Sequence, residues 1–188
     1  MLFRQEGRAE RLEIALLLSW TTMILPVLQY PDPRLKRKAL PIADVTPELR
    51  ELAADMVETM YARDGIGLAA PQVGIAVRLV VMDVSGPDKR EDLRILVNPV
   101  LTLHGKDVDS DEGCLSVPDY RSSVCRKELI HIEATDLDGK PVSIDADGLL
   151  AICAQHECDH LDGTLFIDRI SRLKRTMYDR KMQKKEKP

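Results

Sequence analysis

Residues 155–163 of the chain read QHECDHLDG, in which His156 and His160 stand four positions apart with Glu157 between them. On a helix this spacing directs both imidazole rings from one face, where they can share a metal ion, and the intervening carboxylate can act as a general base. The same face continues upstream with Leu149, Ile152 and Cys153. We therefore expect a buried helix face that ends in a metal site.

The two histidines could instead be ordinary core residues, each hydrogen-bonded to backbone. A buried polar group without a partner costs about 1–3 kcal/mol, so two imidazoles on a core face need partners in either case. One metal ion would satisfy both rings together. The glutamate between them favours the metal interpretation.

A third protein ligand is needed, because a catalytic metal of this kind usually has three ligands and one open position. The metzincin pattern would place a histidine three residues after Gly163, but Phe166 stands there. The two remaining histidines of the chain lie upstream. The upstream candidate is Cys114, in the segment EGCLSVP at residues 112–118. A thiolate is a strong ligand for a soft or borderline divalent metal.

Around these segments the chain divides into helical and strand-like blocks. A first helix is predicted to begin at Pro47, with Thr46 as its N-cap, and to stop at Gly65. Residues 65–74, GIGLAAPQVG, predict a glycine-punctuated loop. Strands are predicted at residues 77–84, 95–103, 129–136 and 142–144, a second helix from near Asp145 or Asp147 to Gly163, and a third, charged helix in the tail. These blocks indicate an α+β fold, with mainly antiparallel sheets packed around the central HExxH helix.

The composition excludes several classes of protein. The 188 residues are 44% apolar and carry a net charge of −4, which favours one folded domain over a disordered chain. The charge is uneven: residues 169–188 hold nine basic residues against two acidic ones, so this tail is +7 and the remainder is −11. We therefore expect no general nucleic-acid binder and no specific DNA binding, but an acidic body with a basic tail. No apolar run approaches the roughly 18–20 residues of a membrane span.

Four cysteines without a CxxC pair favour reduced thiols and a cytoplasmic location. Cys125, Cys153 and Cys158 are each expected to be ordinary buried cysteines. Residues 1–22 mix arginines with glutamates, unlike a signal or transit peptide. We interpret them as an extension, or as codons upstream of a true start at Met23. The predicted division is an extension at 1–22, a catalytic domain at 23–167 and a basic helix at 168–188.

Three segments, residues 65–74, 112–116 and 155–163, resemble in order and spacing the three motifs of the peptide deformylases. The resemblance extends from about Met23 into the tail. It implies a metal-dependent hydrolase that removes the formyl group from the N-terminal formyl-methionine of new polypeptides and releases formate. It also implies one divalent ion per chain, Fe(II) first, with Zn, Ni or Co as substitutes.

The resemblance further assigns roles to individual residues. The metal ligands would be Cys114, His156 and His160, with water in the fourth position. Glu157 would move the proton, while the Gln72 side chain and the Leu115 backbone N–H would stabilise the carbonyl oxygen. The substrate backbone would be bound by Ile66, Gly67 and Gly113. The methionine side chain would be bound by Leu149, Ile152 and Cys153.

Two contacts beyond the metal site are also expected. Glu112 is predicted to pair with Arg121 or Arg126, which would hold the Cys114 segment in place. The resemblance also suggests that the basic helix docks on the ribosome, where RNA phosphates would attract it; a solvated charged helix is the alternative.

Two other functions remain open at this point. A metallopeptidase would need a third ligand downstream of the helix. A ribosome-associated protein with a structural metal would need four closed ligands.

Overall fold

The computed structural model describes residues 22–185. Its elements, in chain order, are η1 (Pro33–Lys36), α2 (Pro47–Ala62), β1 (Gly67–Ala69), η2 (Ala70–Val73), β2 (Leu79–Met82), β3 (Arg94–Cys114), β4 (Val117–Thr135), β5 (Pro141–Asp147), α3 (Gly148–Leu161), η3 (Phe166–Asp168) and α4 (Arg172–Lys185). Residues 1–21 of the predicted extension 1–22 lie outside this range, so the predicted division after residue 22 stays a prediction.

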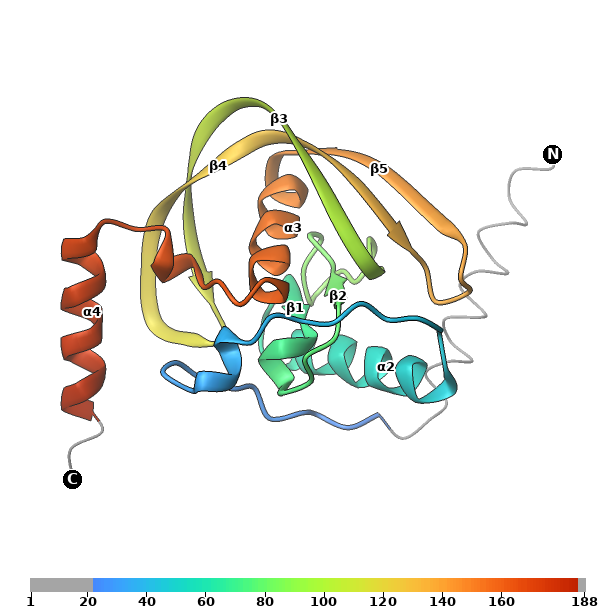
Figure 1. Ribbon diagram of the computed structural model, residues 1–188, viewed down its shortest axis with the longest axis horizontal. Helices are drawn as coiled ribbons and strands as arrows, with labels where there is room; N and C mark the ends of the chain where they lie inside the picture. The colour runs from blue at the N-terminus through green and yellow to red at the C-terminus, as the bar shows by residue number, and fades with distance from the viewer. Residues whose placement is uncertain (1–21, 186–188) are drawn as a thin grey trace.

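The strands form one five-stranded sheet in the order β1-β2-β3-β4-β5, with every neighbouring pair antiparallel. In Figure 1 the long strands β3 and β4 curve over α3, which lies inside the bend of the sheet, while α2 lies on the other side of the short strands. The predicted α+β class and the central position of the HExxH helix are therefore confirmed.

The two long strands are a correction to the sequence analysis, which ended one strand at residue 103 and began the next at 129. In the structure β3 continues to Cys114 and β4 begins at Val117, so the pair forms one long hairpin. The full length of β3 could not be predicted from apolar alternation, because the added residues of the strand are mostly polar and exposed. Polar contacts between the two strands stabilise their pairing in place of apolar ones. One example is the ion pair between Lys127 Nζ and Asp107 Oδ1 at 3.0 Å.

The segment at 65–74 is also more regular than the predicted loop, since it holds β1 and η2. β1 is an edge strand of only three residues, all buried, and it pairs with β2 from Gly67↔Met82 to Ala69↔Val80. So short a strand gives little periodicity to detect. Gly67 in this strand comes close to Cys153 and Glu157 of α3.

The helix starts agree with their sequence signals. The Thr46 hydroxyl accepts a hydrogen bond from Leu49 N at 3.3 Å, and Pro47 opens α2 as predicted. α3 begins at Gly148 after Asp147. Gln155 ties it to β4, because its side-chain amide donates to Lys127 O at 2.8 Å and accepts from Lys127 N at 3.0 Å. The helix is thereby fixed against the sheet next to its histidines.

α3 takes part in a core of aliphatic residues from the sheet and the helix, centred on Ile130, Ile132 and Leu161. A separate cluster around Phe166 receives Tyr178 of α4, which is 1% exposed. The tail helix is therefore packed on the body along one side, rather than solvated all round. Among residues 22–185, no helix has the length and apolarity that crossing a membrane requires.

The cysteines behave differently from one another. All four are free thiols, as expected for reduced cysteines. Cys153 is buried and Cys158 half-buried, but Cys125 is exposed, so its expected burial was wrong. The alternation of β4 gives the reason: Val124 and Arg126 face inward, which turns Cys125 to solvent.

Candidate metal centre

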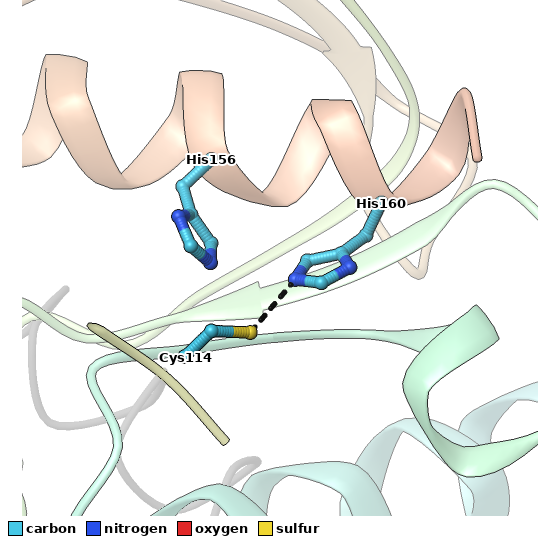
Figure 2. A group of neighbouring side chains, drawn as sticks. All are labelled: Cys114, His156 and His160. Atoms are coloured by element: carbon cyan, nitrogen blue, oxygen red, sulfur yellow. Dashed lines mark hydrogen bonds between the residues drawn. The ribbon is translucent and has the colours of Figure 1, made fainter. Parts of the chain in front are cut away.

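Three side chains from two separate elements meet inside the bend of the sheet. Cys114 is the last residue of β3, whereas His156 and His160 project from successive turns of α3 (Figure 2). Their ligand atoms all lie within 4.8 Å of one another, and in the part of the chain that the structure describes no other group of three or more such residues comes as close. Both histidines are buried.

The donor set fits a divalent metal ion. Ligands bound at the usual Zn–S and Zn–N distances with tetrahedral angles lie about 3.5 Å apart, and Cys114 Sγ lies 3.2 Å from His160 Nε2. Burial, together with the neighbouring His156, lowers the pKa of His160 well below its usual value. The ring of His160 is therefore neutral at ordinary pH and has a lone pair to offer.

His156 is oriented by a carboxylate. Its Nδ1 lies 2.8 Å from Glu112 Oε2, which leaves Nε2 for the cavity side. Burial opposes a charge on this ring, yet the Cys114 sulfur and Glu112 raise the pKa of His156 well above its usual value. The carboxylate of Glu112 therefore places negative charge directly beside this ring.

Glu112 is in turn held by an arginine, and the structure selects between the two candidates. Arg126 Nε and Nη2 donate to the two oxygens of Glu112 at 2.7 and 2.9 Å. Arg121 instead pairs with Asp111 at the surface. Burial would raise the pKa of Glu112, but the hydrogen bonds from Arg126 and His156 outweigh it and hold the pKa at about 2. The carboxylate that orients His156 is therefore ionised.

Glu157 faces the same site without a firm partner of its own. It is 4% exposed, and its Oε2 has no hydrogen-bond partner among the described residues. Burial raises its pKa to about 7. A carboxyl group with this pKa can accept a proton and return it at neutral pH, which is the requirement for a general acid–base.

Gln72, at the end of η2, directs an amide toward the site. It is 2% exposed, and its Oε1 accepts from Ala69 N at 2.8 Å, which fixes the side chain. Its Nε2 therefore points toward the β3–β4 turn, 3.6 Å from Cys114 Sγ and 3.2 Å from Ser116 Oγ. Sequence analysis missed Ser116 as a partner, although it stands inside the quoted motif.

A cavity of about 680 Å³ opens beside these groups. Every predicted site residue except His160 lines it: Ile66, Gly67, Gln72, Gly113, Cys114, Leu115, Leu149, Ile152, Cys153, His156 and Glu157. The predicted buried helix face holds at Cys153, but it was wrong at Leu149, which is 51% exposed on the first turn of α3, and Ile152 is half-buried. Four further lining residues come from the quoted segments or the predicted Glu112 pairing: Gly65, Glu112, Val117 and Arg121. No motif signalled the other five: Asp64, Ser110, Asp111, Asp119 and Tyr120.

Glycine is required where the cavity wall passes closest to the carboxyl group of Glu157. A Cβ on Gly67 would lie 2.8 Å from Cys153 Sγ and closer still to Glu157 Oε1. Any side chain there would displace Glu157, so β1 can pass this close to α3 only through a glycine.

The chain is similar to proteins of one family. A family model described as polypeptide deformylase matches residues 24–176. The peptide deformylase of Desulfosudis oleivorans is 48% identical over 165 residues, which cover 87% of this chain and 95% of that protein. That of Acinetobacter baumannii is 49% identical over 162 residues, covering 86% and 91%.

Solved structures agree with this similarity. A peptide deformylase from Legionella pneumophila superposes with a TM-score of 0.80 at 42% identity, covering 88% of this chain and 99% of that one. The enzyme of Ehrlichia chaffeensis in complex with actinonin superposes with a TM-score of 0.81 at 37% identity, covering 89% and 100%.

Proposed function

Since the chain belongs to the polypeptide deformylase family, whose members remove the N-terminal formyl group of new polypeptides by metal-dependent hydrolysis, we propose that Cys114, His156 and His160 hold the metal for this reaction. The observation that carries the proposal is the convergence of the three ligand atoms within 4.8 Å at the wall of a cavity that Glu157 also lines. The third ligand lies upstream and the described cluster has three ligands, not four. The upstream ligand argues against the alternative of a metallopeptidase, which would need its third ligand downstream of the helix. The count of three argues against a structural metal site, which would need four protein ligands.

The ion itself is proposed to be Fe(II), as the family resemblance implies. One thiolate and two imidazoles also accept Zn, Ni or Co. Bound there, a divalent ion supplies a Lewis acid and lowers the pKa of a coordinated water far below that of bulk water. Glu112 supports this role, because its hydrogen bond to His156 Nδ1 keeps Nε2 free as the ligand atom.

Glu157 is proposed to act as the general acid–base. Its carboxyl takes a proton from the water that attacks the formyl carbon, and then delivers that proton to the amine that leaves. A pKa of about 7 suits both directions of transfer. The amide of Gln72 and the backbone N–H of Leu115 are proposed to donate to the formyl oxygen as negative charge develops on it. The fixed orientation of Gln72 supports its part in this, since no reorganisation is needed.

The peptide is proposed to bind as an added strand. β1 is an edge strand, so the backbone of Ile66 and Gly67 can pair with an extended chain, as can Gly113 across the cavity. Leu149, Ile152 and Cys153 then receive the methionine side chain, because they follow one another along the α3 face toward Glu157. Nascent polypeptides as substrates and four free thiols support a cytoplasmic location.

The variant C114S tests the proposed third ligand. A serine hydroxyl is a far poorer ligand than a thiolate, so we expect metal content after dialysis to fall at least tenfold, with a parallel loss of formate release. Metal analysis and a formate assay on an N-formyl-methionyl peptide, both under anaerobic conditions, measure the two effects. The matched control is C125S, which changes an exposed thiol and should leave both unchanged. Full metal occupancy in C114S would refute the ligand assignment.

We also propose that α4 docks on the ribosome. α4 lies at one end of the molecule (Figure 1), packed on the body through Tyr178, and Arg172 and Arg180 are exposed on it. Arg175 is not available in the same way, because its guanidinium contacts Tyr30, Asp168 and Asp179. Salt should weaken such a contact, because it competes with RNA phosphates for the basic side chains.

The double variant R172E/R180E tests the docking without removing Tyr178 from the core. We expect ribosome co-sedimentation to fall about tenfold at low salt, with peptide deformylation unchanged. The control K89E/K140E reverses two exposed charges outside α4 and should still co-sediment. Wild-type co-sedimentation of R172E/R180E would rule out α4 as the docking element.

A further inference from the structure

Asp159, between the two histidines in sequence, is clamped by two arginines on the other side of α3. Arg126 Nη1 donates to Asp159 Oδ2 at 2.7 Å, and Arg169 Nε donates to the same oxygen at 2.5 Å. Arg169 Nη2 completes a bidentate contact with Oδ1. Asp159 is buried, whereas the side chain of Arg169 is 44% exposed. Both oxygens of Asp159 therefore accept charge-assisted hydrogen bonds, which are stronger than neutral ones and fix the side chain in place.

This clamp is continuous with the metal site. Arg126 uses its remaining Nε and Nη2 donors on Glu112, and Glu112 accepts from His156 Nδ1. The two carboxylates and two guanidinium groups of Asp159, Arg169, Arg126 and Glu112 sum to no net charge. Three of the four are buried, so a change of one charge in this array is weakly screened from His156.

The outer half of the array lies away from the substrate. Asp159 and Arg169 line a second cavity, of about 490 Å³, together with Gln155, Cys158 and Asp162. On a helix these α3 positions fall opposite the face that carries Cys153, His156 and Glu157. Asp159 does not line the cavity proposed for the peptide, so its hydrogen-bonded route to His156 runs through Arg126 and Glu112.

We propose that Asp159 and Arg169 are positioning residues that set the charge beside the metal ligands through Arg126 and Glu112. The inference rests on the proposed metal site. Removing the charge of Asp159 leaves the array at +1 beside a divalent cation, which disfavours the ion. Removing the charge of Arg169 leaves the array at −1, which favours it. The two changes are therefore expected to move metal affinity in opposite directions.

The test compares D159N and R169M in the full-length protein, with Zn²⁺ affinity measured by competition against a chromophoric chelator. We expect D159N to bind Zn²⁺ about tenfold more weakly than wild type, the size of effect typical of groups behind a metal ligand. R169M is expected to bind about threefold more tightly. The matched control is D162N, which neutralises an acid of the same cavity that pairs with Arg78 instead; its affinity should equal that of wild type.

The outcomes separate the possible failures. If D159N and R169M both weaken Zn²⁺ binding, or neither changes it while both lower the melting temperature, the pair is a structural clamp only and the inference is wrong. If wild type itself binds no Zn²⁺, or C114S binds as wild type does, the proposed metal site fails first. A shift of equal size in D162N would show that the effect is general surface charge, which also overturns the inference.

Discussion

The variant E157Q is expected to lower kcat for formate release about 1,000-fold while its metal content stays at the wild-type level. A positioned general acid–base contributes roughly 10²–10⁴ to the rate, and the amide of glutamine can neither accept nor return the proton. Glutamine matches glutamate in shape, so the tight approach of Gly67 and Cys153 to this side chain is kept. The loss should therefore be chemical and not structural.

The measurement is steady-state formate release from an N-formyl-methionyl peptide, together with metal analysis of the same sample. Because Glu157 is not among the proposed ligands, KM and metal content should change little. The control E128Q alters a carboxylate of β4 that pairs with Lys106 at the surface and should be as active as wild type. More than a tenth of wild-type activity in E157Q would mean that another group moves the proton. Loss of metal would instead make Glu157 a structural element of the site.

The sequence predicts the chemistry of the site better than the shape around it. His156, Glu157 and His160 lie within five consecutive positions of one helix, so local geometry alone brings them together. Cys114 reaches them only through the long β3–β4 hairpin, whose turn ends at Val117. The polar stretch 104–112 has no apolar alternation that would predict a strand, because the strand is stabilised by its pairing with β4. The need for a third ligand and the chemistry of a thiolate made Cys114 the candidate, the family resemblance then assigned it as a ligand, and periodicity contributed nothing.

The supporting network shows the same limit. Arg121 and Arg126 are equivalent candidates in the sequence, since both follow Glu112 within the same stretch. Strand alternation decides between them, because Arg126 faces inward from β4 whereas Arg121 faces out. Asp159 occupies a variable position of the HExxH motif, and the sequence predicts no contact for it. Its role depends on Arg126 and Arg169, which approach from opposite directions along the chain and are not linked to it by any local pattern.

Replacement of Arg126 is expected to cause the largest loss in the free energy of unfolding. Its side chain is 2% exposed and binds two carboxylates, Glu112 and Asp159. Replacing it with methionine fills most of the space but leaves both acids buried without their shared cation. Breaking a buried pair in this way costs about 3–5 kcal/mol, because an uncompensated charge remains in a medium of low polarity. We expect R126M to lose that much free energy of unfolding.

Urea unfolding of chelator-treated protein measures this loss without the added contribution of metal binding. The matched control is R121M, five residues away on the same strand, whose ion pair with Asp111 is exposed on both sides. Surface pairs contribute at most about 1 kcal/mol, so R121M should unfold nearly as wild type does. If R126M and R121M lose the same small amount, the buried array does not stabilise the fold. If R126M alone is destabilised, Arg126 compensates the buried charge of Glu112, the carboxylate that contacts His156 Nδ1.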